Sequence, residues 1–412
     1  MSIEIKMAWR NIWRNSRRSI LTILAIVFAT MLLVFMLSFQ FGSYDTMINT
    51  AVKIHTGHVQ VQAEGYRDKM DTRLVVPDPG AVDDVIKDIP EIEAYTSRAN
   101  AFSLVSSSDR TYGVLLTGID PEREAKVSTL KKLVRRGEYL AQEDTDMALV
   151  GKLLARNLKV DIGDELVVLG QGRDGSVAAS VLKVKGIFSS GEDKFDRNSV
   201  QMPLGYFQDV FFMRGAVHEV VVLGRFLEDV KKIKKELGAG VRNIDSDGNL
   251  AVLDWMELMP GIVQSIKLDL VSGLIMYVIL IVVVAFSILN TFLMAIFERT
   301  REFGVLMAIG MTPGRLMRSL FLESVTITLI GIILGIISGG MVTWYFQVHG
   351  ILISGASELL SQYGLPERMY PQLSVLSISV GAGIVLIITI LTAIYPVLKV
   401  RRLKPVEAMT AV

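Results

Sequence analysis

The stretch ERTREFGVLMAIGMTPGRL, Glu298 to Leu316, lies between two long apolar runs of the chain. It is charged and contains glycines and a proline. Its apolar residues Phe303, Leu306, Met307 and Ile309 are nevertheless spaced as on a short helix. We therefore expect a helical connection between two membrane crossings, and the function of the protein depends on what this connection contacts.

Four apolar runs reach the roughly 20 residues that a helix needs to cross a bilayer. The expected spans are residues 20–41, 270–297, 320–346 and 375–398. The first run follows a basic segment, as in a signal peptide, but it is too long and no small-residue cleavage site follows it, so we expect a retained span. The composition, 51% hydrophobic and 21% charged, indicates a membrane protein with a sizeable aqueous domain.

Lysines and arginines next to the apolar runs predict the orientation. They gather in residues 1–19, in the connection 298–319 and in the tail 399–412, which are expected in the cytoplasm with both termini. Residues 42–269 and the loop 347–374 are then extracytoplasmic. A net charge of +1 gives no reason to expect a nucleic-acid partner.

The region 42–269 has a soluble composition and an α+β pattern. Residues of about 42–120 and 203–254 are expected to form one part, with a half-buried strand at Val59 and Val61 and a helix that stops at Gly238. About 121–202 is expected to be an inserted β-rich subdomain, with a hairpin at its glycine-rich turn. Residues 252–269 are expected to form a stalk helix. The fold class is thus an α-helical membrane protein with four transmembrane helices and a large extracytoplasmic α+β domain.

The sequence gives no case for an enzyme. There is no cysteine, and the pair Gly151-Lys152 lacks the pattern of a phosphate-binding loop, so ATP chemistry would belong to another chain. His55 and His58 would face opposite sides of a strand and are expected as polar surface or edge residues, not metal ligands. We predict no catalytic, cofactor-binding or metal site in this chain.

Two anchors are expected at the membrane surface. Trp9 and Trp13 lie on one side of a helical wheel beside basic residues, which predicts an interfacial helix over residues 1–19; an ordinary basic flank is the alternative. Glu323 lies a turn inside the third apolar run, where a carboxylate is costly unless it is paired or reaches the interface. It is expected either to pair with Arg315, Arg318 or a neighbouring span, or simply to reach the interface.

Two motifs together resemble a known family. ERTREFGVLMAIGMTPGRLMRSLFLESV and the C-terminal YPVLKVRRLKPVEAMTA are similar to segments of the FtsX/MacB/LolE-type (type VII, mechanotransmission) permeases of ABC transporters. The single span before a large outer domain and the three clustered later spans also fit. The resemblance implies a porter-like outer domain with a β-rich part, and a coupling helix that docks on a cytoplasmic ATPase. The residues implied for coupling are Arg301, Glu302, Phe303, Gly304, Leu306, Met307 and Gly310.

The resemblance also implies partners. They are an ABC ATPase dimer that binds ATP and Mg, a second permease copy or paralogue, membrane lipids, and a periplasmic carrier or adaptor. Spans one and two are implied to face each other across the dimer and to enclose a lipid-accessible cavity. The residues expected there are Met36, Phe39, Phe41, Leu268, Val271 and Ile275; ordinary lipid-facing or packing positions are the alternative.

The layout is closest to the lipoprotein-releasing LolC/LolE branch, because no ATPase is fused to the chain. We therefore expect a bacterial inner-membrane permease that extracts lipoproteins or another amphiphile. Export of peptides, antibiotics or toxins with adaptor and outer-membrane partners is one alternative. Regulation of a cell-wall hydrolase without a transported substrate is another.

Overall fold

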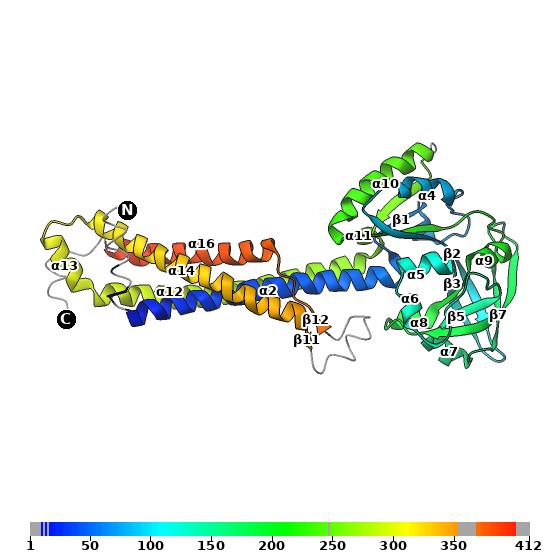
Figure 1. The fold of residues 1–412 in the computed structure, drawn as a ribbon, viewed down its shortest axis with the longest axis horizontal. Coiled ribbons are helices and arrows are strands. Elements are labelled where there is room, and N and C mark those ends of the chain that lie inside the picture. Colours follow the sequence, from blue (N-terminus) through cyan, green and yellow to red (C-terminus); the bar gives the residue numbers. More distant parts are fainter. Residues whose placement is uncertain (1–9, 11–12, 15, 246–247, 353–367, 401–412) are drawn as a thin grey trace. The chain divides into compact units, whose positions relative to one another are not determined.

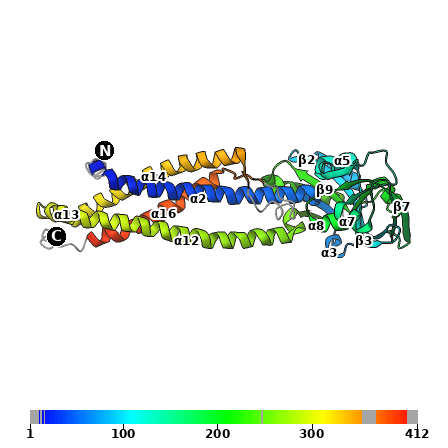
Figure 2. The ribbon, with the colours of Figure 1, turned by 90° about the horizontal axis from the view of Figure 1, so that it is seen from below.

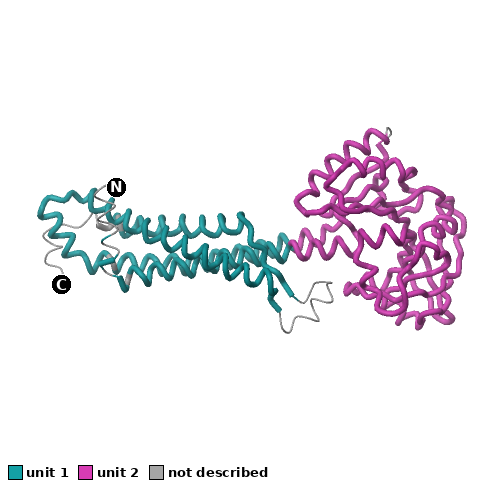
Figure 3. Tube along the Cα trace, in the orientation of Figure 1, with its two compact units in different colours: residues 1–44, 266–352, 368–412 teal, residues 45–265, 353–367 magenta. Residues whose placement is uncertain are grey.

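The computed structural model describes residues 10, 13–14, 16–245, 248–352 and 368–400. The described residues divide into two compact units (Figure 3). The helical unit lies within residues 1–44, 266–352 and 368–412, and the α/β unit comprises residues 45–265.

The helical unit is built from long apolar helices that run side by side (Figures 1 and 2). Among the described residues, four helices are long and apolar enough to cross a membrane, which confirms the four predicted spans. It contains most of α2 (Ser16–Ala51) and of α12 (Pro260–Glu298), together with α13 (Thr300–Ala308), α14 (Pro313–His349), α16 (Val375–Val400) and the paired strands β11 (Ile351–Leu352) and β12 (Arg368–Met369).

Glycines allow α14 to lie very close to α2. Gly331, Gly335 and Gly339 recur every four residues and so share one face of α14. A Cβ atom added at Gly335 would lie 2.5 Å from Cβ of Thr30, and one added at Gly331 would lie 2.7 Å from Cγ2 of Ile26. Small residues at this spacing are typical of close helix packing in membranes, because they let two helices approach and gain van der Waals contacts where no hydrophobic effect drives association.

The α/β unit contains a ten-stranded sheet with the order β10-β1-β9-β2-β3-β8-β5-β7-β4, and β6 pairs with both β2 and β7. Because of the β6 pairing, β2, β3, β8, β5, β7 and β6 form a closed ring around a hydrophobic core. The strands are β1 (Val59–Ala63), β2 (Ile92–Ser106), β3 (Thr111–Ile119), β4 (Val134–Gly137), β5 (Met147–Gly151), β6 (Glu165–Gln171), β7 (Val177–Phe188), β8 (Ser199–Pro203), β9 (Glu219–Gly224) and β10 (Leu250–Asp254).

Short helices connect and cover these strands (Figure 1). Asp78 and Asp120 each cap a helix that begins with proline, since their carboxylates accept hydrogen bonds from the free backbone N–H groups of the first turn. The helices are η1 (Val52–Thr56, a π-helix), α3 (Tyr66–Lys69), α4 (Pro79–Lys87), α5 (Pro121–Val127), α6 (Leu130–Leu133), α7 (Lys152–Leu158), α8 (Asp193–Asn198), α9 (Leu204–Val210), η2 (Leu227–Asp229), α10 (Val230–Ile244) and α11 (Trp255–Leu258).

One of the local predictions is confirmed and two are wrong. The hairpin at the glycine-rich turn is the antiparallel pair β6 and β7. Strand β1 is buried along its whole length and not half-buried, because it lies between β10 and β9 with α10 packed on it. Helix α10 does not stop at Gly238 but continues to Ile244, since Leu237 and Val241 are both buried on its inner side.

The expected subdomain 121–202 and the expected stalk helix 252–269 do not coincide with separate elements of the structure. The segment 121–202 contributes strands to the same sheet as its flanks, since β8 pairs in parallel with β3 and β6 pairs with β2. The segment 252–269 begins as strand β10 and continues as α11, which ends before Met259. Helix α12 then starts at Pro260, whose ring suits a first helical turn.

Candidate functional site

The candidate site is the connection between α12 and α14, formed by helix α13 and the turn that follows it. The α13 helix ends with backbone hydrogen bonds from the N–H groups of Ile309, Gly310 and Met311 to the last turn. Gly310 has φ of +106°, a conformation that residues with a Cβ rarely adopt, so glycine is needed at this turn. Pro313 then starts α14. The sequence thus sets a helix, a tight turn and a second helix in close succession.

One side of α13 is buried inside the chain. The Phe303 side chain is fully buried and packs with Ile296, Leu316 and Leu320, and Leu306 and Met307 are partly buried against this cluster. This corrects the expectation that the side chain of Phe303 lies on an exposed docking surface. The physical reason is that the ends of α12 and α14 fold over this side of α13 and already cover it.

The opposite side of α13 is exposed and carries its own apolar residues. Val305 is 44% exposed and Ile309 is 79% exposed, and Arg301 lies four residues before Val305 on the same side of the helix. We call Arg301, Val305 and Ile309 the α13 stripe. An exposed isoleucine beside a cation is suited to contact with a partner protein. Arg301, one of the residues predicted for coupling, lies on this exposed side.

Electrostatic contacts hold α13 against the spans. Arg299, only 9% exposed, donates from Nη1 to both carboxylate oxygens of Glu323, at 3.2 and 3.1 Å, and its guanidinium lies 5.3 Å from the centre of the Phe303 ring. Glu323 is therefore paired, but its partner is Arg299 and not Arg315 or Arg318. Because Arg299 lies between the end of α12 and the start of α13 and Glu323 belongs to α14, this pair closes the base of the connection.

A second contact links the N-terminal segment to α13. The Arg14 guanidinium donates to the carboxylate of Glu302, which also lies 3.4 Å from Nε of Arg299. Both members of the Arg14–Glu302 pair are about half exposed, so this pair adds little stability. Trp13 is 52% exposed, and Trp9 lies outside the described residues. Gly304, like Phe303, is buried.

The six residues predicted for a substrate cavity lie on α2 and α12. Leu268, Val271 and Ile275 are exposed by about 60% each on α12, whereas the three α2 residues, Met36, Phe39 and Phe41, are half-buried.

Sequence reasoning missed a polar cluster beside these residues. Gln40 donates to Asp269 at 3.1 Å and accepts from the Tyr277 hydroxyl at 2.8 Å, and the Tyr44 hydroxyl donates to Asp269 at 2.5 Å. These bonds tie α2 to α12. Polar side chains next to apolar runs were a usable signal for such a contact.

Two buried histidines belong to the framework of the α/β unit. His58, 1% exposed, accepts a hydrogen bond from the Gly224 N–H at 3.0 Å, so the expectation of a surface or edge histidine is wrong for it. His218 is fully buried, accepts from the Asn100 N–H at 2.8 Å, and stacks on Tyr66. Burial lowers the pKa of each to about 4, so both are neutral at pH 7. Among the described residues, no group of three His, Asp or Glu side chains could hold a metal ion.

Two family models match the chain. A MacB-like periplasmic core domain matches residues 19–239, and an FtsX-like permease C-terminal region matches residues 274–405. The first match contains most of the α/β unit, and the second contains the connection between α12 and α14.

Named relatives come from several transport systems. LolC of Xylella fastidiosa (strain 9a5c), a lipoprotein-releasing system transmembrane protein, is 23% identical over 73% of this chain and 74% of its own length. The pyoverdine export ATP-binding/permease protein PvdT of Pseudomonas fluorescens is 23% identical over 99% of this chain and 59% of its own length. The macrolide export ATP-binding/permease protein MacB of Campylobacter jejuni is 22% identical over 83% of this chain and 53% of its own length.

A solved structure also matches part of the chain. The periplasmic region of MacB from Actinobacillus actinomycetemcomitans aligns with 52% of this chain and 94% of its own, at 14% identity and a TM-score of 0.38.

Proposed function

The chain belongs to the family of ABC transporter permeases with a MacB-like periplasmic core domain and an FtsX-like C-terminal region, and we propose that it couples a separate cytoplasmic ATPase to movements of its α/β unit. In this proposal the chain itself performs no catalysis. ATP and Mg are bound by the partner ATPase, and two permease subunits, identical or paralogous, assemble with an ATPase dimer.

The α13 stripe is the observation that carries the coupling proposal. Val305 and Ile309 are apolar and exposed, whereas Phe303 on the other side is fully buried. Because the Arg299–Glu323 pair holds the start of α13 against α14, α13 can transmit a displacement without unfolding. We therefore propose that the stripe, and not the Phe303 side, docks on the ATPase, with Arg301 and Glu302 at the rim and Leu306 and Met307 as support.

Charge placement supports an orientation in the membrane. The basic residues near α13 and in the flanking segments favour the cytoplasm for this connection and for both termini. The α/β unit then belongs outside the inner membrane of a bacterium. The apolar side chains of α2 and α12 named above are proposed to border a lipid-accessible cavity across the dimer.

For the substrate, we propose lipoproteins or another amphiphile that is extracted from the membrane. The support is the similarity to LolC, which is named for a lipoprotein-releasing system. The exposed apolar face of α12 is suited to a lipid-like substrate. A periplasmic carrier would be expected to receive the extracted molecule.

Export of a soluble small molecule is the second candidate. It is favoured by the match to the pyoverdine export protein, which extends over 99% of this chain. In that case an adaptor and an outer-membrane channel would replace the carrier.

Reconstitution with the native ATPase tests the two candidates against each other. Proteoliposomes would contain a fluorescent triacylated peptide in the membrane, or pyoverdine in the lumen. ATP-dependent transfer of the peptide to a soluble acceptor is expected, and an ATPase variant that cannot hydrolyse ATP is the control. Pyoverdine movement without peptide release would reject extraction in favour of export. If neither molecule moves although ATP is hydrolysed and the complex is intact, the extraction proposal fails.

A further inference from the structure

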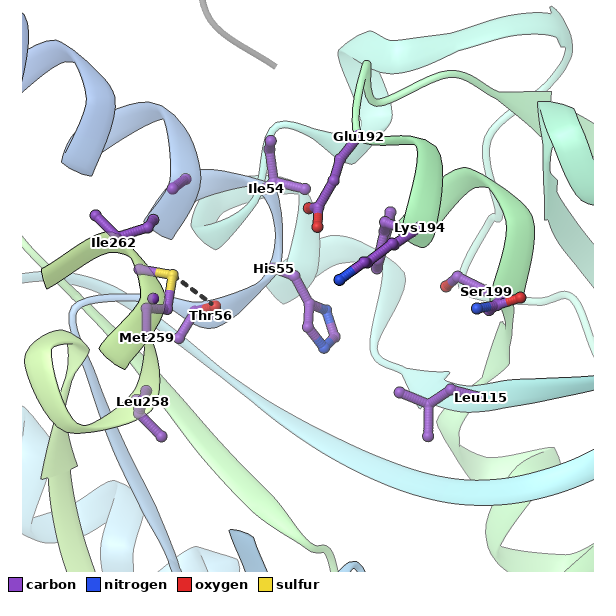
Figure 4. Close-up of a pocket in the computed structure, with 14 residues that line it drawn as sticks. Ile54, His55, Thr56, Leu115, Glu192, Lys194, Ser199, Leu258, Met259 and Ile262 are labelled. Carbon is purple, nitrogen blue, oxygen red and sulfur yellow. Dashed lines mark hydrogen bonds between the residues drawn. The ribbon is translucent and has the colours of Figure 1, made fainter. Parts of the chain in front are cut away.

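The α/β unit contains a pocket of about 740 Å³ that the coupling proposal does not use (Figure 4). Its walls come from segments far apart in the sequence: η1, strand β3, helix α8 with the start of β8, and the residues around the α11–α12 junction. Its size is in the range of sites that bind small ligands.

One side of the pocket is apolar. Leu258, Met259 and Ile262 from the α11–α12 junction lie together on one side of the pocket, and Ile54 from η1 lies across from them, as Figure 4 shows. Leu115 contributes an apolar side chain from β3 across the pocket. Such a surface gains free energy by covering an aliphatic chain, in proportion to the area removed from water.

The other side of the pocket is lined by polar side chains. Ser199 is 3% exposed, and its hydroxyl has no hydrogen-bond partner in the described part of the chain. An unmet buried hydroxyl carries a desolvation cost that a ligand acceptor would remove. Ser199 is paired with Leu115 in the β3–β8 register, so a polar and an apolar side chain of the pocket are neighbours on adjacent strands. Glu192 and Lys194 point toward the same space (Figure 4).

A buried charge pair fixes the pocket wall at His55. Arg98 and Glu124 are almost completely buried and form two hydrogen bonds, at 2.9 and 2.7 Å. Arg98 also donates from Nη1 to the backbone oxygen of His55 and lies 3.3 Å from its Nδ1. The His55 ring lies 5.3 Å from that of Phe195, which lines the same pocket. A wall held in this way is preformed, which reduces the entropic cost of binding.

We propose that this pocket binds one aliphatic chain of an amphiphile together with a zwitterionic head of the phosphoethanolamine type. In this proposal the aliphatic chain of the ligand packs against Ile54, Met259 and Leu115. The Ser199 hydroxyl and the Lys194 ammonium donate to phosphate or ester oxygens, and Glu192 accepts from the head ammonium. The inference rests on the proposed function only for the amphiphilic class of substrate.

Photo-cross-linking of the full chain in phosphatidylcholine nanodiscs tests the pocket. The probe is lysophosphatidylethanolamine with a diazirine in its acyl chain, and mass spectrometry locates the adducts. We expect adducts on the peptides that contain Leu115 and Phe195, because both residues line the pocket. Both also lie in the α/β unit and outside the candidate spans, so these adducts can be distinguished from labelling of the spans in the bilayer. Competition with unlabelled lysophosphatidylethanolamines should weaken about fourfold for each methylene removed from the chain.

Two competitors separate the head from the chain. Glycerophosphoethanolamine, which lacks the chain, should fail to compete if the apolar wall contributes most of the affinity. A fatty acid of the same chain length should compete more weakly than the lysophospholipid. Equal competition by the fatty acid would overturn the assignment of the head to Ser199, Lys194 and Glu192.

Variants make the test specific to the pocket. Leu115→Trp fills the space and should reduce adducts on the Phe195 peptide at least tenfold, and Ser199→Ala should weaken labelling about fivefold. Val167→Trp is the matched control, because Val167 is a half-exposed strand residue of the same unit that does not line the pocket. Protease resistance of the α/β unit checks the folding of each variant.

The results also separate this inference from the proposed function. Adducts confined to the candidate spans, or adducts on the Phe195 peptide that persist in folded Leu115→Trp, would overturn the pocket. If Leu115→Trp loses the adducts and also slows ATP-dependent release of the lipidated peptide, the pocket handles the substrate. If the adducts never form while release proceeds normally, the pocket proposal fails and the proposed function stands.

Discussion

The α13 stripe predicts that two neighbouring apolar residues respond to substitution in opposite ways. We consider Ile309→Asp on the exposed side and Phe303→Ala on the buried side. The first should leave the permease folded and impair its binding to the partner ATPase. The second should destabilise the connection between α12 and α14 before any partner is added.

The structure sets the size of each effect. Complete burial of an isoleucine side chain is worth about 1.5–3 kcal/mol. Since 79% of Ile309 is exposed in the chain, its coverage by a partner would contribute about 2 kcal/mol, or roughly 30-fold in Kd. An aspartate at the same position would place an unpaired carboxylate in the interface, which costs several kcal/mol more and should weaken binding by about 1,000-fold or more.

Phe303→Ala acts on folding because the ring is fully buried. Removal of such a ring from a packed cluster typically costs about 3–5 kcal/mol. The ring also lies under the Arg299 guanidinium, so the Arg299–Glu323 pair loses part of its support. Protease sensitivity between α12 and α14 should rise in the permease alone.

The assay is co-purification of the ATPase with each variant, followed by measurement of coupled ATPase activity. Val177→Asp is the matched control, since Val177 is an exposed apolar residue, at 73%, in the α/β unit. Normal ATPase recovery and normal coupling with Ile309→Asp would refute docking through the stripe. A Phe303→Ala permease that is as stable as wild type but fails to bind ATPase would refute the inward placement of this ring.

Three further results are expected. A membrane-impermeant thiol reagent on intact cells should label a single cysteine introduced at Ser176 and not one at Thr312; the opposite pattern would reverse the orientation. Glu323→Gln should lower the stability of the helical unit by about 2 kcal/mol in thermal unfolding, because the charge of Arg299 then loses its paired carboxylate; an unchanged midpoint would contradict that role. The pKa of His218 is about 4 in the fold and 6.5 ordinarily, so the unfolded chain binds more protons between these values; stability is complete above pH 6.5 and falls toward pH 4, by about 2 kcal/mol at pH 5. A His218→Gln variant should lose this part of the pH dependence, measured by protease resistance of the α/β unit; an unchanged slope would exclude His218 as its source.

The sequence by itself determined the features that depend on local pattern. The four apolar runs predict spans because only length and composition are required, and the glycine-rich turn predicts the β6–β7 hairpin because both strands adjoin it. The presence of a short helix between spans two and three followed from the spacing of its apolar residues. The glycines at positions 331, 335 and 339 carried a signal of the same local kind for the contact between α14 and α2.

Only the tertiary structure decided which apolar residues of α13 are covered. Phe303 and Ile309 are both apolar, and periodicity alone cannot say which of them the ends of α12 and α14 will bury. The same holds for contacts between residues distant in sequence: Arg315 and Arg318 are nearer to Glu323 in the sequence, but packing pairs it with Arg299. Pairing of β6 with β2 closes the ring of strands, and the Arg98–Glu124 pair fixes His55, through partners that no local pattern identifies. The physical reason is that local geometry follows from residue spacing, whereas the choice among equivalent partners depends on how the whole chain excludes water and satisfies its buried charges.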